Sequence, residues 1–237
     1  ESNGFLFDEN QWKDLLKKYQ DRKKENQKRL EEIAGYNLNA NSPKQVFQFL
    51  TKDLSLPLTA STGEDNLVAL LGNHCKDERS REAINLILDI RRVRKTIGTY
   101  LSAQPDFDGR MRTSYRIVGT ETGRSSTSNL DAPLRPIKGF GLAFQTITKH
   151  GDIGADIRRM LISDEGYKII DPDLSQAEAR VVSLLSDDEE TLRLFDTMDI
   201  HKLTASWLFG KSMEAITKEE RFIGKTVRHA GNYGMGK

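Results

Sequence analysis

Hydrophobic residues recur at helical spacing through the first hundred residues. A sparse apolar stripe that includes Leu15, Tyr19 and Leu30 predicts a long helix over residues 8–34, and Gly35 is placed to end it. Such narrow stripes indicate a helical arm. The same spacing predicts three further helices, over residues 42–54, 65–74 and 82–101.

Beyond Pro105 the pattern changes to short apolar runs. Alternation over residues 111–118 predicts a strand, and two more strands are expected over residues 160–162 and 168–170, around an Asp-Glu-Gly turn. Residues 120–147 are rich in Gly, Ser, Thr and Pro and are expected to form an ordered loop. Strands between two helical parts indicate an α+β chain.

Helical spacing returns after residue 175 and continues to the end of the chain. Three capping boxes, in which a Ser or Thr is followed three residues later by Glu, are expected to open helices there. They are Ser175 with Glu178, Ser186 with Glu189, and Thr217 with Glu220.

The composition is that of an ordinary soluble globular protein. The chain has 237 residues, 37% of them hydrophobic and 30% charged, with a net charge of +1. No apolar run approaches the ~20 residues that span a membrane, and no signal peptide is visible. The single cysteine, Cys75, excludes an internal disulfide and fits a reducing compartment.

A strong chemical signal lies around Asp173. The β-branched run at residues 168–170 precedes it and a helical pattern over residues 177–185 follows, so Asp173 is expected at the exit of a strand. A carboxylate fixed there can hold a divalent metal ion. An Asp close to a helix N-terminus is also favoured by the helix dipole alone, and the local pattern leaves both interpretations open.

A second signal is a stripe of four side chains spaced by four residues. Arg221, Lys225, His229 and Tyr233 are expected along one face of a helix over about 18 Å. Two cations, an imidazole and an aromatic ring suit a triphosphate, a sugar and a base. A Gly-Lys-Thr sequence at residues 224–226 is not a phosphate-binding loop, because Glu219 stands where that motif needs Gly.

These two stretches resemble motifs A and B of the family-A DNA polymerases, of the bacterial DNA polymerase I type. Three further segments match motifs of that family in the family's order, so the resemblance covers nearly the whole chain. They are residues 41–45 in the thumb, residues 112–130 at the primer strand, and residues 199–210 between motifs A and B.

The resemblance implies a fragment of a right-hand polymerase with an α+β fold. A helical thumb is expected over residues 1–105, a partial palm with an antiparallel sheet over residues 106–185, and the start of helical fingers over residues 186–237. The implied reaction is template-directed transfer of deoxynucleotides to a primer 3′ end, in DNA replication or repair. The implied partners are primer-template DNA and deoxynucleoside triphosphates, without a membrane, in a bacterial or phage-infected cytoplasm.

The resemblance also assigns roles at the reaction centre. Asp173 and the carbonyl of Leu174 would hold two Mg²⁺ ions. Lys225 would act in catalysis and bind the triphosphate. Glu178 would exclude ribonucleotides by closing on the 2′ position of the sugar, or serve only as a capping partner. The residues expected to bind the nucleotide are Arg221, Lys225, His229, Tyr233, Glu178 and Gln176.

A further set of residues is expected to contact DNA. Arg124 would reach the minor-groove side of the primer terminus. The basic cluster at residues 91–95 would contact backbone phosphates, whereas residues 13–29 fit a solvated helix face equally well. His201 and Trp207 are expected to pack. The expected DNA-binding residues are Arg124, Arg112, Asn41, Lys44, Arg91 and Lys95.

Several departures from the family pattern indicate a phage-like or otherwise divergent branch. His229 replaces an aromatic residue, residues 131–142 are extra, and Asp171-Pro172 replaces small residues. The sequence stops after motif B and contains no His-Asp-Glu motif C. We therefore expect a piece of a polymerase that is inactive alone. The alternative is the DNA-binding half of a split polymerase, which needs a second chain carrying motif C.

Overall fold

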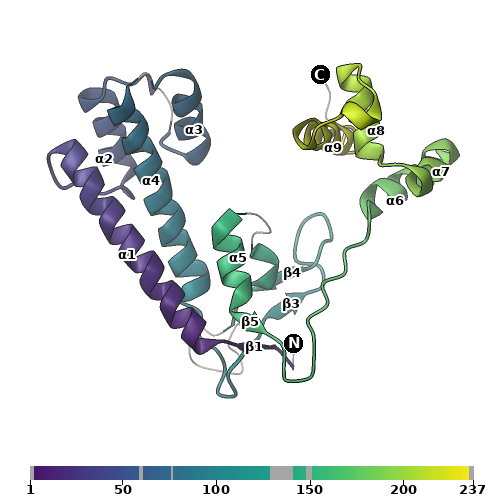
Figure 1. Ribbon diagram of the computed structural model, residues 1–237, viewed down its shortest axis with the longest axis horizontal. Helices are drawn as coiled ribbons and strands as arrows, with labels where there is room; N and C mark the ends of the chain where they lie inside the picture. Colours follow the sequence, from purple (N-terminus) through teal and green to yellow (C-terminus); the bar gives the residue numbers. More distant parts are fainter. Residues whose placement is uncertain (1–2, 59–60, 76, 129–140, 148–150, 235–237) are drawn as a thin grey trace. The chain divides into compact units, whose positions relative to one another are not determined.

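The computed structural model describes residues 3–58, 61–75, 77–128, 141–147 and 151–234 (Figure 1). The chain divides into two compact units, Glu1–Ile169 and Ile170–Lys237. Within the described residues no helix is both long and apolar enough to cross a membrane. The expected boundaries at residues 105 and 185 stay a prediction.

A helical arm, residues 9–101, forms much of the first unit. Its helices are α1 (Glu9–Ala34), α2 (Pro43–Gln48), α3 (Glu64–Asn73) and α4 (Glu78–Thr96). Helices α1 and α4 run side by side (Figure 1). Both α2 and α4 end in a π-helical turn, at Phe49–Asp53 and Ile97–Leu101. The four helices expected from the sequence are thereby confirmed.

Capping side chains explain where these helices begin and end. Asp8 accepts a hydrogen bond from the N–H of Gln11 at 3.0 Å and opens α1, and Gly35 ends it with a φ of 82°. Helix α4 begins four residues before the expected position. The reason is a cap that spacing did not reveal: Asp77 accepts from the N–H of Ser80 at 2.7 Å.

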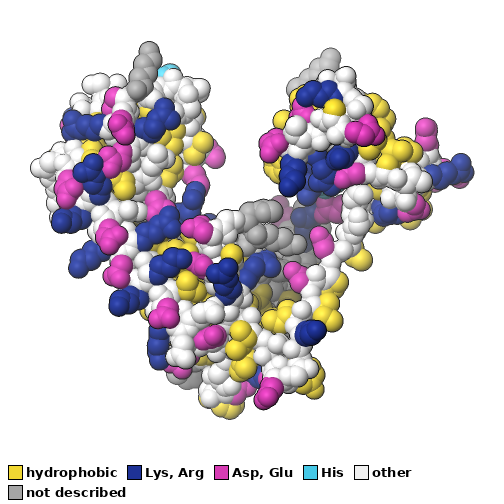
Figure 2. Space-filling model, viewed as in Figure 1, with side chains coloured by type: hydrophobic (Ala, Val, Ile, Leu, Met, Phe, Trp, Pro, Cys, Tyr) yellow, Lys and Arg dark blue, Asp and Glu magenta, His cyan; other side chains and the backbone are white. Residues whose placement is uncertain are grey.

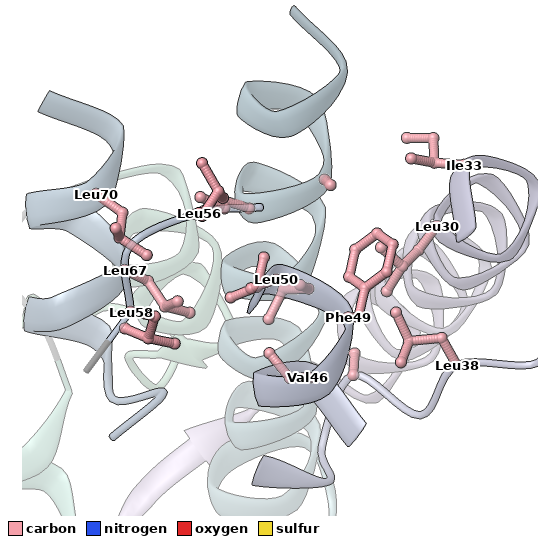
Figure 3. Packing of buried hydrophobic residues seen from close by; sticks show 14 of the residues in the cluster. Leu30, Ile33, Leu38, Val46, Phe49, Leu50, Leu56, Leu58, Leu67 and Leu70 are labelled. Atoms are coloured by element: carbon pink, nitrogen blue, oxygen red, sulfur yellow. The ribbon is translucent and has the colours of Figure 1, made fainter. Parts of the chain in front are cut away.

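The far end of the arm has its own hydrophobic core (Figure 3). The ring of Phe49 is fully buried and lies close to Leu30 and Leu38. These side chains come from α1, the following loop and the first π-helical turn. The same core includes residues of α3 and α4, so it joins segments that are distant in sequence. The other fully buried aliphatic residues of this core are Ala40, Val46, Leu50, Leu67, Ala83, Ile84, Ile87 and Ile90.

Two small antiparallel sheets lie at the base of the arm. Strand β1 (Phe5–Phe7) pairs with both β2 (Arg110–Met111) and β5 (Leu161–Ile162), and β3 (Ser114–Arg116) pairs with β4 (Ser126–Ser128). A helix, α5 (Gly151–Arg159), precedes β5. Its buried Asp156 accepts a hydrogen bond from the hydroxyl of Tyr19 at 2.8 Å, which fixes α5 on α1.

Two strand predictions need correction. The strand expected over residues 111–118 is two strands in different sheets, because the Thr113 side chain turns inward and its hydroxyl donates to the carbonyl of Ser128. Residues 168–170 are not a strand, although β-branched residues favour one. A strand needs a neighbour for its backbone groups, and no strand of the described residues pairs with this segment.

The second unit consists of helices. They are α6 (Ala177–Leu185), α7 (Glu189–Thr197), α8 (Ile200–Phe209) and α9 (Lys218–Asn232). The capping box of Thr217 and Glu220 at the start of α9 is confirmed. The interpretation of the Asp131–Leu142 insertion falls mostly on residues 129–140, which lie outside the described residues.

The other two capping boxes are wrong. Gln176, with a left-handed φ of 56°, occupies the N-cap position of α6, so Ser175 lies one residue too early to cap it. Ser186 closes α6 instead of opening α7. The cap of α7 is Asp188, which accepts a hydrogen bond from the N–H of Thr191 at 3.0 Å.

Candidate nucleotide and DNA sites

One face of α9 carries most of the residues that the sequence assigned to the nucleotide. Lys225, His229 and Tyr233 line one open hollow, as their four-residue spacing predicted. Lys225 and Tyr233 are exposed, and Tyr233 is the C-cap residue of the helix. The remaining lining residues are Phe222, Thr226 and Ala230. An ammonium group and an aromatic ring thus lie two helical turns apart on one accessible surface.

Arg221 serves a structural contact at the start of the same helix. Its Nε donates to Oδ2 of Asp199 at 2.6 Å, and Asp199 also caps α8 by accepting from the N–H of His201 at 2.9 Å. Burial disfavours the ionised carboxyl of Asp199, but Arg221 and the backbone N–H groups hold its pKa below the usual value. From the sequence, Asp199 was included only in a motif of the family, and its contacts were not predicted. Its role as a helix cap could have been predicted, because an Asp directly before a helical pattern is a common N-cap.

Helices α8 and α9 approach each other closely at Gly224. A Cβ at this position would lie 2.4 Å from the carbonyl oxygen of His201 and 2.8 Å from the backbone N of Ala205. Only a residue without a side chain allows this approach. The Gly-Lys-Thr sequence therefore lies inside a helix and its glycine is explained by helix packing.

We predict that Gly224→Ala destabilises the second unit by about 1–3 kcal/mol, because the clashing atoms belong to the backbone of α8. Urea unfolding followed by circular dichroism would measure the loss. Gly231→Ala is the matched control, since no atom lies within 4 Å of a Cβ at that position of α9. Equal stability of the two variants would contradict the close packing.

Two histidines meet between α8 and α9. The ring of His201 is 5% exposed and its centroid lies 5.8 Å from that of His229. Burial, and then the charge of Arg221, lower the pKa of His201. His201 thus packs as expected. Trp207, in contrast, is 68% exposed, so its predicted packing role is wrong within this chain.

Acid should destabilise the second unit through His201. A lowered pKa means that the folded state favours neutral imidazole, so this contribution is present above the unfolded-state pKa of about 6.5 and is lost as pH falls below it. The facing groups that set this balance are Arg221, Asp199, His229 and Lys225.

The measurement is the melting temperature of the second unit at pH 7.5 and 5.5. We expect the wild type to lose more on acidification than His201→Gln, and the exposed control His74→Gln to lose as much as the wild type. The same loss in His201→Gln as in the wild type would rule out His201 as the source.

Glu178 of α6 faces His229. Its Oε2 lies 3.8 Å from Nδ1 of His229, too far for a hydrogen bond but close enough for an ion pair when the imidazole is protonated. The capping interpretation of Glu178 fails with the Ser175 box. The carboxylate is half exposed beside the hollow of α9. This position is compatible with the predicted role next to a nucleotide sugar.

Asp173 lies exposed on an irregular segment before α6, not at a strand end as predicted. Leu174 is 80% exposed beside it. The predicted nucleotide-binding residue Gln176 follows, with its Oε1 buried and without a hydrogen-bond partner. The described residues contain no group of three or more His, Cys, Asp or Glu that could hold a metal ion. Two exposed carboxylates, Asp171 and Asp173, lie on this segment, and only Asp173 was predicted to hold a metal ion.

The arm presents a groove that collects several predicted DNA contacts. Asn41, Arg91 and Lys95 line this groove, which measures about 830 Å³, together with Arg94 and Gly98. Figure 2 shows Lys and Arg side chains mixed with acidic ones over the arm on the face in view. Lys44 is exposed on α2 but is not among the lining residues. The sequence spacing could not predict that Asn41 lies beside the basic residues of α4, because only the fold brings these segments together.

The two other predicted DNA contacts lie outside the arm. Arg112 is paired with Asp106 at 2.9 Å and with Asp108 at 2.5 Å, and this pairing lowers the pKa of Asp108 to about 2. Much of its charge is therefore neutralised inside the chain. Arg124 is exposed in the turn between β3 and β4, where its backbone N–H donates to the hydroxyl of Thr120. The structure does not bring these two arginines into the groove of the arm.

Comparison with a solved structure agrees with this architecture. The fold is similar to that of the POL domain of Pol1 from M. smegmatis, solved in complex with DNA primer-template and dNTP. The TM-score is 0.76 at 23% identity, over 98% of this chain and 40% of that one. At this identity the similarity establishes the fold alone: the chain has the fold of part of a polymerase domain.

Sequence comparison establishes the family. The profile described as DNA polymerase family A matches residues 9–237, and the chain belongs to this family. It is 33% identical over 211 residues to the thermostable DNA polymerase I of Thermus aquaticus, covering 86% of this chain and 24% of the relative. It is 30% identical over 246 residues to DNA polymerase I of Caldicellulosiruptor bescii, covering 99% and 27%. The chain spans about a quarter of these relatives' length.

Proposed function

We propose that this chain takes part in template-directed DNA synthesis, the addition of deoxynucleotides to a primer 3′ end. The observation that supports this most strongly is the hollow on α9, which is lined by Lys225, His229 and Tyr233. Membership of DNA polymerase family A gives the reaction class, and the M. smegmatis complex with primer-template and dNTP suggests the partners.

The hollow suits an incoming deoxynucleoside triphosphate laid along the helix. The ammonium group of Lys225 would bind the phosphates as a point charge. Arg221, one turn earlier, is tied to Asp199 through Nε, so its remaining N–H groups would be its contribution to the phosphates. The base would stack on Tyr233, and the sugar would lie near His229 and Glu178, where a 2′ hydroxyl would meet the carboxylate.

Asp173 fits a divalent ion that arrives with a nucleotide. Mg²⁺ is commonly held by one or two carboxylates, substrate phosphates and water, and the exposed carboxylate of Asp173 meets that minimum. The carbonyl of the neighbouring Leu174 would be a second ligand. When bound, Mg²⁺ neutralises charge at the reacting phosphates. The task of Asp173 is to hold its carboxylate beside the first turn of α6, open to solvent and to substrate.

The arm would hold the primer-template duplex. Exposed Lys95 and Arg94 at the groove suit backbone phosphates, and Asn41 can donate to phosphate or sugar oxygens. Lys44 lies nearby in sequence, on α2, as a further cation. Arg124 would reach the primer terminus from the β3–β4 turn. These assignments correspond to a thumb, a partial palm and the start of the fingers. The protein would act in the cytoplasm of a bacterium or of a phage-infected cell.

Primer extension on four templates that differ in one templating base tests this function. The chain is assayed alone and together with a second polypeptide. The second polypeptide supplies the part of a related polymerase domain that has no counterpart in this chain. We expect the combination to add only the complementary deoxynucleotide to the primer. Addition that ignores the template, or no addition despite tight DNA binding by the combination, would contradict the proposal.

A further inference from the structure

Arg91 lies at the groove of the arm, but its described hydrogen bonds go to neutral oxygens of the protein. Nε donates to the carbonyl of Ala40 at 2.8 Å, Nη1 donates to the carbonyl of Thr62, and Nη2 donates to the hydroxyl of Thr62 at 3.3 Å. Burial lowers the pKa of this guanidinium. Three of its five N–H donors are thus directed at the protein itself.

The acceptors belong to two loops that contribute lining residues to the groove, one before α2 and one before α3. Ala40 and Thr62 are buried at 0% and 4% exposure. Thr62 itself and the neighbouring residues Asn41 and Gly63 line the groove. One turn further along α4, Lys95 belongs to the same lining. Arg91 therefore links both loops to α4.

We propose that Arg91 is a positioning residue, which holds Asn41 and the loop at Gly63 in register with Lys95 so that the groove fits the sugar-phosphate backbone of a DNA duplex. This inference rests on the proposed binding of DNA by the arm. It replaces a direct phosphate contact by Arg91 with an indirect role. Lysine cannot substitute for it, because an ammonium group lacks the planar fork that reaches three acceptors at once.

The experiment compares the affinity for a primer-template duplex across a series of salt concentrations, for the wild type, Arg91→Lys and Arg91→Gln. We expect both variants to bind at least about tenfold more weakly, with the wild-type slope of log affinity against log salt. Lys95→Ala, which removes a phosphate contact, should instead reduce the slope by about 0.9. All assays are run well below each variant's melting temperature.

The matched control is Arg81→Lys. Arg81 lies on the same helix and its Nη2 donates to the carbonyl of Cys75 at 3.0 Å, but it is not at this groove. Losing the hydrogen bond from Arg81 to Cys75 should lower the melting temperature and leave the affinity for DNA unchanged. A double-mutant cycle adds a readout that a purely structural role would not move: Arg91→Lys and Asn41→Ala should be non-additive in DNA binding, since one acts through the other.

Thr62→Val keeps the test valid if the Arg91 variants do not fold. Thr62 lines the groove but is only 4% exposed, and this change replaces the hydroxyl that accepts from Arg91 with a methyl group. We expect weaker DNA binding with an unchanged salt slope. Three results would overturn the inference. They are wild-type DNA affinity of Arg91→Lys, additive effects of Arg91→Lys and Asn41→Ala, and a salt slope reduced by about 0.9 in Arg91→Gln but not in Arg91→Lys. A wild type that shows no salt-dependent DNA binding would instead refute the proposed function of the arm.

Discussion

Asp173→Ala should abolish DNA synthesis in an active polymerase preparation that contains this chain. The expected loss is on the order of 10³-fold or more, because the carboxylate proposed to hold the divalent ion at the reacting phosphates is removed. The measurement is single-turnover incorporation of one complementary deoxynucleotide. Affinity for primer-template DNA should stay nearly unchanged, since phosphate contacts by Lys and Arg carry that binding.

Asp171→Ala is the matched control for Asp173. Both carboxylates are exposed on the same irregular segment, two residues apart, so the two variants lose the same charge at nearly the same place. A long-range charge effect would reduce the rate equally in both. Equal losses, or ordinary synthesis by Asp173→Ala, would refute the assignment of Asp173 as the metal ligand.

Lys225→Ala should have the second largest effect. Its ammonium group is exposed on the hollow of α9 and would neutralise charge at the triphosphate, so its removal should reduce incorporation by about 10²–10³-fold. Binding of a fluorescent deoxynucleoside triphosphate should weaken in parallel. Both quantities are obtained from the dependence of the incorporation rate on nucleotide concentration.

Lys218→Ala provides the control on the same helix. Lys218 is an exposed lysine in the first turn of α9 and does not line the hollow. We expect it to behave as the wild type. If Lys225→Ala were as active as Lys218→Ala, Lys225 would be a solvated surface residue and the phosphate end of the proposed nucleotide site would be lost.

Helical spacing and capping residues predicted the long elements because both are local properties. The stripe of α1 and its ends at Asp8 and Gly35 follow from the sequence within a few residues. The failures occurred where a neighbour distant in sequence decides. The run at residues 168–170 has strand composition but no strand partner within the described residues, and Thr113 breaks a predicted strand by turning toward β4.

The candidate site divides in the same way. The four-residue spacing on α9 was sufficient to place Lys225, His229 and Tyr233 together, because one helix fixes their relation. It could not show that Arg221 is held by Asp199, or that Arg91 ties two loops to α4. Both contacts join residues more than 20 positions apart, and only the fold brings them together.

Photolabelling with a deoxynucleoside triphosphate tests most directly whether the α9 face binds the incoming nucleotide. A photoreactive triphosphate is irradiated with the chain and primer-template DNA, and the labelled residues are located by mass spectrometry. We predict label between Phe222 and Tyr233, removed by excess unlabelled deoxynucleoside triphosphate and strongly reduced in Lys225→Ala. Label confined to residues 1–169, or label on α9 that unlabelled nucleotide does not compete away, would contradict the account.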